Sequence, residues 1–383
     1  MKTSFFLFVA FLFLSCNSTD STPPEKDSEV FETEYRVSAP DGFLPWPQHN
    51  PGWDEADVMK ELVNNLFVIN NFGQFQGFET DMNQNYFHSG VDIVVKNGTP
   101  IFSVEEGTVV SLSGSAPYYQ TLTIESENNT NYGWAYTHIN KIAVDVGEKV
   151  KQGTFVGRIN FQGLEHLHLE RVKKPEDKEW TNYDEIIDLD TESYFYYQDK
   201  IPPVLKTPFH YFKNQTNIEF SNDSLATVSG AVDIVAGMRE VAPHSNDPIS
   251  RFGDRLGVSN ISYKITKSDS VLFSSDSFDF TKFEIQKPIR QNNPERVYKN
   301  NVLFEGALDS FDKMFSYYII TNTSLTFSGN EDIIPDNAWN TLEKNEVGES
   351  RYPNGLYKIE ITASDSKGNS VTALDSVWVD NSL

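Results

Sequence analysis

Four of the seven histidines in this 383-residue chain lie between residues 88 and 168. His166 and His168 are two apart, and His88 and Asp92 are four apart within an apolar run. Side chains alternate faces along an extended strand, so residues an even number apart point the same way. Two imidazoles and a carboxylate directed at one point supply the three protein ligands of a hydrolytic zinc site, with a fourth position for water. A structural zinc site would more often use cysteines, and the chain has only one.

The stretch around these residues has the pattern of a β domain. Short apolar runs separated by glycine and asparagine turns occupy residues 71–174, which is typical of antiparallel sheet. Gly107, Gly147 and Gly153 fit tight turns. We therefore expect little helix here and strands over residues 99–112, 120–126, 134–138, 150–159 and 166–172.

The last part of the chain, residues 227–383, also alternates apolar runs with turn signals, notably Pro353-Asn354-Gly355 and the residues 366–369. This pattern predicts a β-sandwich. The closing residues, 354–379, resemble the final hairpin of bacterial immunoglobulin-like or fibronectin-like modules. Such sandwiches serve as spacers as often as binders, so the function of this one stays open and a protein partner is possible.

The fold class expected is mainly β, with an antiparallel sheet domain followed by an immunoglobulin-like β-sandwich. A short amphipathic helix is expected over residues 54–66 as a packing element, with Asp54 as its cap. The expected division is a signal peptide (1–15), a flexible tether (16–40), a lead-in segment with the helix (41–71), the histidine-bearing domain (72–175), a connector (176–226) and the sandwich (227–383).

The start of the chain predicts export. Residues 1–15 combine a charged start with an apolar core too short to span a bilayer, as in a signal peptide. Cys16 follows at once, and Phe13-Leu14-Ser15-Cys16 resembles the lipobox of bacterial lipoproteins, although Phe13 and Leu14 depart from its usual residues. This implies a cell-envelope protein attached to a bacterial membrane by a lipid on Cys16, in the periplasm or at the cell surface. The alternative is a secretory signal with a chance cysteine.

The charge of the chain bears on its partners. The formal net charge is −24 and the sequence pI is about 4.6. Nucleic-acid binding requires a clustered basic surface to contact phosphates, and the sequence has no such cluster. We therefore expect no nucleic-acid partner.

Three motifs together carry a family resemblance. His88-Ser89-Gly90-Val91-Asp92, Tyr136-Thr137-His138-Ile139 and His166-Leu167-His168-Leu169-Glu170 resemble, in order and separation, the zinc peptidases of the lysostaphin type, also called LytM-like, which are cell-wall endopeptidases. The resemblance spans residues 72–175. It implies that His88, Asp92 and His168 bind one zinc ion. It also implies that His138 and His166 line the site without binding the metal.

The remaining chemistry agrees with these roles. The sequence has no His-Glu-x-x-His motif, so imidazole is the proton carrier available near pH 7. We expect one of His138 and His166 to help activate the water and the other to stabilise the oxyanion, with the order open. The residues before the histidine pair, 159–165, depart from the family pattern, which leaves substrate preference open. Glu165, next to the histidine pair, either adds negative charge near the metal or is a solvated turn residue.

The leading hypothesis is a zinc-dependent endopeptidase of the bacterial cell envelope that cuts peptide bonds in peptidoglycan cross-links or stem peptides. The alternative is a noncatalytic relative that binds cell wall or activates another hydrolase; such proteins typically lack one or more ligands, and all five site residues are present here. A biotinyl or lipoyl carrier domain is disfavoured because residues 146–157 contain no lysine flanked by methionine.

Overall fold

The computed structural model describes most of the chain after residue 67. The described residues form strands and short 3-10 helices without an α-helix, which confirms the expected mainly β fold class. None of their helices is both long and apolar enough to cross a bilayer. The expected signal peptide, tether and helix over residues 54–66 lie outside the described residues. These are 41–48, 68–78, 81–115, 119–160, 165–176, 178–180, 186–197, 199–220, 225–241, 256–286, 294–299, 312, 314–323, 327–328 and 337–382.

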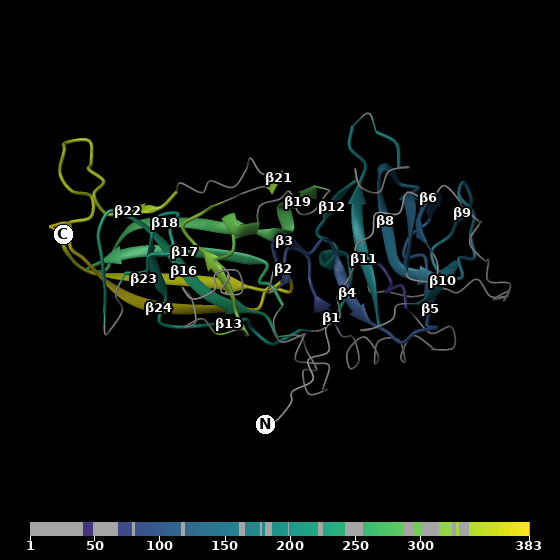
Figure 1. Ribbon diagram of the computed structural model, residues 1–383, viewed down its shortest axis with the longest axis horizontal. Coiled ribbons are helices and arrows are strands. Elements are labelled where there is room, and N and C mark those ends of the chain that lie inside the picture. The colour runs from purple at the N-terminus through teal and green to yellow at the C-terminus, as the bar shows by residue number, and fades with distance from the viewer. Residues whose placement is uncertain are drawn as a thin grey trace, which may run out of the picture.

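A twelve-stranded sheet carries the histidines (Figure 1). Its main path runs β21-β19-β12-β11-β8-β7-β6-β9, while β4 pairs with β1 and β11, and β10 pairs with β5 and β8. The strands are β1 (Val68–Asn70), β4 (Val91–Val94), β5 (Pro100–Phe102), β6 (Gly107–Ser115), β7 (Tyr119–Ser126), β8 (Asn129–Asn140), β9 (Lys149–Val150), β10 (Phe155–Ile159), β11 (His166–Lys173), β12 (Ile187–Leu189), β19 (Phe283–Gln286) and β21 (Phe327–Ser328).

One face of this sheet packs into its own core. Alternate residues of β4, β8 and β11 are apolar, so each strand presents one buried side. Trp134, Tyr136, Val91, Leu167 and Leu169 are all buried in this core. The opposite face of β4 and β11 is thereby left to polar side chains, among them the histidine pair. We call this cluster the peptidase core, after the family that the sequence resembles.

The second part of the molecule is a sandwich of two five-stranded sheets with a common core, the sandwich core. One sheet holds β13 (Val204–Leu205), β14 (His210–Lys213), β16 (Ala231–Arg239), β20 (Ser316–Ile319) and β22 (Trp339–Asn340). The other holds β15 (Ala226–Val228), β17 (Asn260–Lys267), β18 (Ser270–Asp279), β23 (Gly355–Ser364) and β24 (Ser370–Val379). In β23, Tyr357, Ile359 and Ile361 point inward and are fully buried, so the period-2 pattern of the sequence corresponds to the buried face.

Several of these elements fall near the expected boundaries, which remain predictions. The expected hairpin at residues 366–369 joins β23 to β24, with Gly368 at a φ of 86°. β13 and β14 come from the region expected to be connector and pair with β16. β1 comes from the expected lead-in segment and pairs with β4 of the histidine-bearing sheet. Most of the pairing is antiparallel, and β15 is parallel to β24.

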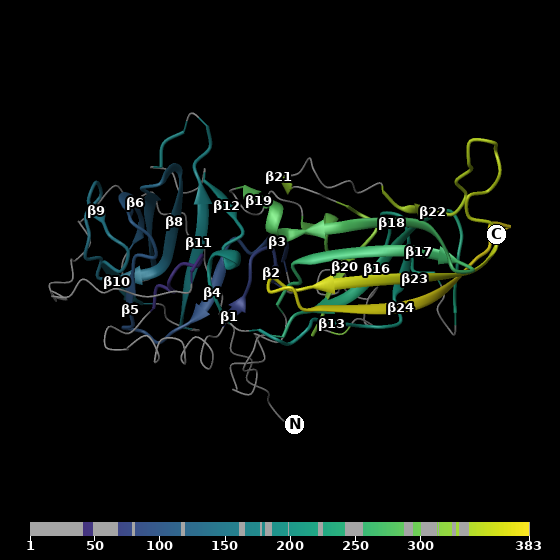
Figure 2. The same cartoon turned by 180° about the vertical axis from the view of Figure 1, so that it is seen from behind.

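The two parts of the molecule share a sheet edge. β12 pairs with β19, so the sheet that carries the histidines continues into strands packed on the sandwich (Figures 1 and 2). Lys173 of β11 and Glu284 of β19 form an ion pair at 2.9 Å. Both views place the two-stranded sheet of β2 (Phe75–Phe78) and β3 (Asp81–Phe87) at the same junction. The chain therefore crosses between the parts beside the metal-site candidates.

A buried acidic group lies at this junction. Glu192, in the 3-10 helix η2 (Glu192–Tyr194), is buried near Glu240 at the end of β16. Lys367 of the β23–β24 hairpin donates to the carbonyl oxygens of Glu192 and Phe195, at 3.4 and 3.1 Å. Burial raises the pKa of Glu192 to about 7, against the opposing charge of Lys367. An ionised Glu192 is therefore costly in the folded protein.

This burial predicts a pH-dependent free energy of unfolding. The pKa of Glu192 in the folded protein lies above its ordinary value of 4.5. The protonated side chain therefore adds to the free energy of unfolding below pH 4.5, and this stabilisation is lost as pH rises through about 7. Between pH 5 and pH 8 we expect the free energy of unfolding to fall by about 2 kcal/mol for this reason. We expect Glu192→Gln to remove most of this loss in urea unfolding, whereas Glu346→Gln, at an exposed position, leaves it. Equal pH dependence in both variants would contradict the assignment.

Candidate metal centre

The metal-site candidates lie where β4 and β11 pair. These antiparallel strands place His168 directly opposite Asp92. Leu167 and Leu169 point into the peptidase core and are fully buried. Because side chains alternate along a strand, His166 and His168 project from the other face, as their even spacing predicts. The strand register therefore brings an imidazole and a carboxylate together without help from a loop.

His88 reaches the site from outside β4. His88 and Asp92 would share one face if the run through both were extended, but β4 begins at Val91 and residue 90 lies in a bend. Gly90 permits this bend to approach β11, since a β-carbon on residue 90 would lie 2.3 Å from the carbonyl oxygen of Leu169. The His88 ring then turns back toward β4, and its Nε2 lies 3.2 Å from Asp92 Oδ1.

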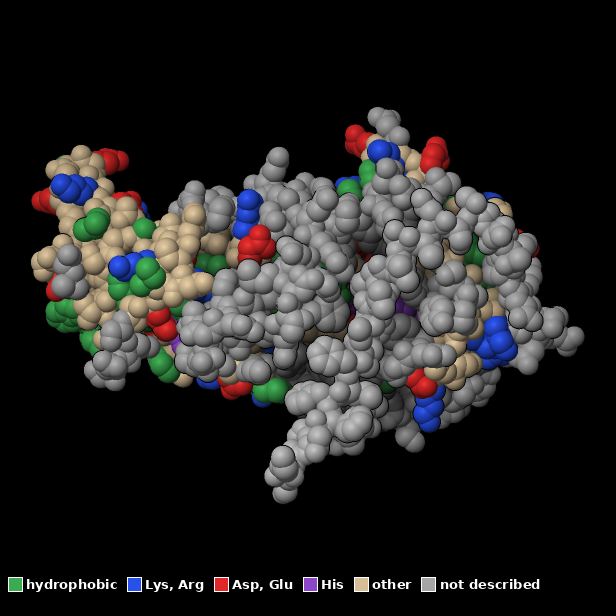
Figure 3. All heavy atoms as spheres, viewed as in Figure 1, with side chains coloured by type: hydrophobic (Ala, Val, Ile, Leu, Met, Phe, Trp, Pro, Cys, Tyr) green, Lys and Arg blue, Asp and Glu red, His purple; other side chains and the backbone are tan. Residues whose placement is uncertain are grey.

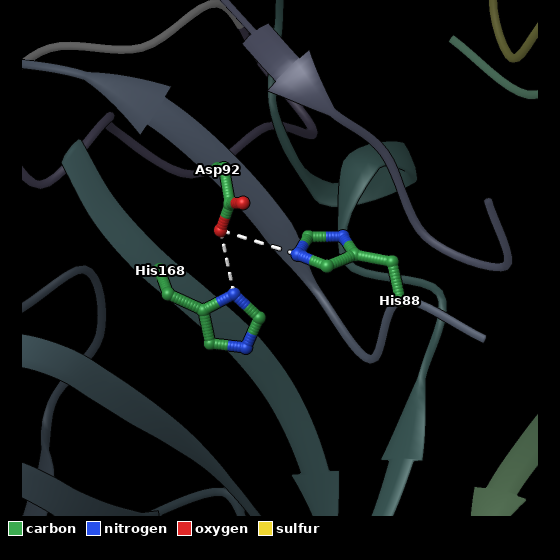
Figure 4. Close-up of side chains that lie close together, drawn as sticks. All are labelled: His88, Asp92 and His168. Carbon is green, nitrogen blue, oxygen red and sulfur yellow. Dashed lines mark hydrogen bonds and ion pairs between the residues drawn. The ribbon is translucent and has the colours of Figure 1, made fainter. Parts of the chain in front are cut away.

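Three donor atoms converge at this point (Figure 4). Nδ1 of His168 lies 2.7 Å from Asp92 Oδ1, on which His88 Nε2 also converges. One ligand atom from each of the three residues lies within 4.8 Å of the other two. Two imidazole nitrogens and one carboxylate oxygen form a donor set of the kind that holds a hydrolytic zinc ion.

The outer atoms of His88 and Asp92 are already engaged. The Nδ1 of His88 lies 3.1 Å from the carbonyl oxygen of Asn71 and must donate to it, because a carbonyl can only accept. The Nε2 lone pair therefore faces the site. Asn70 Nδ2 donates to Asp92 Oδ2 at 2.7 Å, which leaves Oδ1 for the site. Outer-shell partners of this kind fix the tautomer and orientation of metal ligands.

The third candidate ligand has the same support. His168 Nε2 lies 3.1 Å from Oε1 of Glu170, whose side chain is fully buried, so Nδ1 is the nitrogen that faces the site. Ser89 Oγ donates to the same Glu170 oxygen at 2.7 Å. A carboxylate behind a metal-binding histidine raises the basicity of the imidazole. All three residues thus fit a bound cation on the evidence of their own contacts.

The charges at the site favour a cation. Burial raises the pKa of Asp92, but the charges of His88 and His166 outweigh it, with hydrogen bonds from neighbouring imidazoles, and hold this pKa well below its usual range. Burial lowers the pKa of His168, but the carboxylates of Glu170 and Asp92 raise it to about 10. The pocket between these groups therefore attracts positive charge strongly, as a proton or as a metal ion.

The two remaining histidines border the same point. His166 Nε2 lies 3.7 Å from Asp92 Oδ1, and the rings of His138 and His166 are 4.6 Å apart between centroids. His138 has a φ of 68°, in the left-handed region that non-glycine residues seldom adopt. Burial, with the charges of His166 and His168, lowers the pKa of His138 to about 3. All five residues singled out by the sequence thus lie together, and His138 is neutral near pH 7.

Two of the five site residues are partly exposed. His138 and His168 are partly exposed, in contrast to His88 and Asp92, which are buried. Histidine atoms are visible at the surface over the peptidase-like part in Figure 3. Of the three candidate ligands, His168 has the most exposed side chain.

The sequence did not assign roles to Asn70, Asn71 and Glu170. Glu170 carried a signal, because it ends His-Leu-His-Leu-Glu and lies an even number of residues from the histidine pair. Asn70 and Asn71 precede the stretch on which the family resemblance rests, so no local pattern marked them. Asn70 and Asn71 meet Asp92 and Gly257, which are distant in the sequence, only because of the tertiary fold.

Other sequence-derived candidates have structural contacts. The Glu165 carboxylate accepts from the backbone nitrogen and the side chain of Asn97, at 3.1 and 3.0 Å, which favours a role in holding the loop after β4. His210 Nδ1 lies 2.7 Å from Glu219 Oε1, so this histidine has a carboxylate partner within the sandwich. His49, His244 and residues 161–164 of the atypical loop lie outside the described residues.

Comparison with known proteins finds a family match for the segment that carries this site. Residues 86–180 match the sequence model of peptidase family M23. The matched range contains all five site residues. An uncharacterized metalloprotease of Buchnera aphidicola is 34% identical over 86 residues, which is 22% of each chain. The peptidoglycan DD-endopeptidase ShyA of Vibrio cholerae is 33% identical over 88 residues, which is 22% of this chain and 20% of that protein.

A third relative is a lipoprotein NlpD/LppB homolog of Pseudomonas aeruginosa, 31% identical over 94 residues, or 24% of this chain and 31% of that protein. This chain therefore spans less than a third of the length of these relatives. Among solved structures, the catalytic domain of lysostaphin from Staphylococcus simulans aligns with a TM-score of 0.25 and 24% identity, covering 30% of this chain and 86% of that chain.

The contact behind His168 gives a prediction about metal affinity. Glu170→Gln keeps the size of the side chain but removes the charge that supports the imidazole. We expect zinc affinity, measured by chelator competition, to fall by about 10- to 100-fold. Glu105→Gln is the matched control, since Glu105 accepts hydrogen bonds from Trp134 and Ser126 of the same sheet and forms an ion pair with Arg171. Unchanged affinity in Glu170→Gln would refute this role.

Proposed function

We propose that this protein is a zinc-dependent endopeptidase of the bacterial cell envelope that hydrolyses peptide bonds in peptidoglycan cross-links or stem peptides. The observation that carries the proposal is the convergence of His88, Asp92 and His168, each with its outer atom held by a separate partner. The match to peptidase family M23 supports the reaction class. The names of the relatives, one a peptidoglycan endopeptidase, support the substrate.

In the proposal, His88 Nε2, Asp92 Oδ1 and His168 Nδ1 hold one zinc ion. When bound by three such ligands, zinc polarises a peptide carbonyl and lowers the pKa of bound water toward neutrality. The protein itself then needs to orient the peptide and to move a proton. The two histidines that are not ligands are available for those tasks.

We assign these tasks from geometry and charge. His166 lies beside Asp92, at 3.7 Å, and takes the proton of the attacking water. His138, whose pKa is lowered to about 3 by burial, stays neutral and donates a hydrogen bond to the oxyanion. A neutral imidazole can donate in this way because one ring nitrogen carries a hydrogen.

Two substitutions separate metal binding from proton transfer. His168→Ala is expected to abolish both zinc retention and the hydrolysis of purified sacculi, because it removes a ligand. His166→Ala is expected to retain zinc and to lose about 10²- to 10⁴-fold in hydrolysis, because it removes the proton carrier alone. Metal analysis and mass spectrometry of released muropeptides provide the two measurements.

The control is His210→Ala, which removes a histidine of the sandwich bonded to Glu219 and should change neither property. Undiminished hydrolysis by His168→Ala would rule out the mechanism. Zinc-loaded protein that binds sacculi and releases no muropeptides would instead indicate the noncatalytic cell-wall-binding or hydrolase-activating function.

For location, the proposal includes export and a lipid on Cys16. The support is the apolar leader and the lipobox-like residues before Cys16, together with a relative named as a lipoprotein homolog. Cys16→Ser should move the full-length protein from the membrane fraction to the soluble fraction of the expressing cells, whereas Ser18→Ala should not. Equal membrane retention of both variants would contradict the anchor.

A further inference from the structure

The chain on either side of His88 is divided between two cores. Phe87 is fully buried in the sandwich core, with its ring centroid 6.1 Å from that of Phe283 and 5.9 Å from that of Tyr298. Three residues after His88, Val91 is fully buried in the peptidase core. His88 therefore lies at the boundary, and its position depends on how the two cores are placed.

The same division occurs in the segment behind the site, residues 70–74, called here the linking segment. Asn70 ends β1 of the twelve-stranded sheet and donates a hydrogen bond to Asp92. Phe72, two residues later, is buried in the sandwich core. Gly73 accepts a hydrogen bond on its carbonyl oxygen from Tyr298 Oη at 2.7 Å. The linking segment thus contacts the candidate ligands on one side and the sandwich on the other.

Asn71 is the centre of this connection. Its side chain makes two hydrogen bonds to the backbone of Gly257: Nδ2 donates to Gly257 O at 2.7 Å, and Oδ1 accepts from Gly257 N at 2.8 Å. Gly257 lies between Leu256 of the peptidase core and Val258 of the sandwich core. Its own carbonyl oxygen accepts from His88 Nδ1 at 3.1 Å. Asn71 is 2% exposed, so water cannot replace these bonds without rearrangement.

We propose that Asn71 is a positioning residue through which the sandwich completes the metal centre, with Gly257 fixing the carbonyl that orients His88. The sandwich is then a part of the metal site and not a spacer beside it. This inference rests on the metal binding in the proposed function but not on the substrate, because it concerns the affinity and geometry of the bound ion.

The test uses the full chain and reads metal binding directly. Asn71→Ala removes both bonds to Gly257 but keeps the backbone carbonyl. Zinc affinity by chelator competition is expected to fall about tenfold, the lower end of the effect of outer-shell contacts. The visible absorption spectrum of the cobalt-substituted protein should shift, because it reports the arrangement of the ligands.

Asn381→Ala is the matched control. The Asn381 side chain likewise makes two hydrogen bonds to the backbone: its Nδ2 donates to the carbonyl oxygens of Thr341 and Tyr352 at 2.8 and 2.9 Å. The two alanine variants lose comparable contacts, so both should lower the melting temperature. Only Asn71→Ala should change the zinc affinity and the cobalt spectrum.

Tyr298→Phe is a second, conservative variant in case Asn71→Ala fails to fold. It keeps the packed ring and removes one hydrogen bond from the sandwich to the linking segment, and zinc affinity should fall by a smaller factor. Wild-type affinity and spectrum in every folded variant would overturn the proposal, as would an equal loss of affinity in Asn381→Ala. Failure to cleave sacculi with intact zinc binding would count against the proposed function alone.

Discussion

The metal centre depends on one constraint, the burial of three electron-pair donors close together: Asp92 Oδ1, His88 Nε2 and His168 Nδ1. Isolated buried carboxylates are strongly disfavoured, and this one is 6% exposed. Two imidazole nitrogens, of His88 and His168, face the same oxygen at 3.2 and 2.7 Å. Such a cluster is stable only with positive charge at its centre, which a proton supplies in the metal-free protein and a divalent ion supplies in the proposed enzyme.

Two kinds of contact keep this cluster together. The pairing of β4 with β11 fixes Asp92 against His168, and this is a property of the peptidase-like sheet alone. The position of His88 has a different origin, since Phe87 is buried in the sandwich core and the carbonyl that orients the imidazole belongs to Asn71. The centre thus lies at the boundary of two cores. The position of His88 relative to Asp92 and His168 depends on how the two parts of the molecule are placed.

Local patterns in the sequence predicted the parts that follow strand periodicity. The alternation of Leu167 and Leu169 with the histidines indicated a shared face, and residues 356–363 and 370–379 indicated the closing hairpin. The bond between Asn71 and Gly257 joins positions 186 apart, and no period or motif encodes it. The position of His88 outside a strand was also missed, because an apolar run does not reveal the bend that Gly90 allows.

The central claim is that one zinc ion is held by His88, Asp92 and His168, with His138 and His166 close by but unbound. Anomalous diffraction at the zinc edge from crystals of the zinc-loaded full chain measures this directly. The account predicts a single peak about 2.0–2.2 Å from His88 Nε2, Asp92 Oδ1 and His168 Nδ1. A peak bound by His166 in place of His168, or the absence of a peak between these three residues, would contradict it.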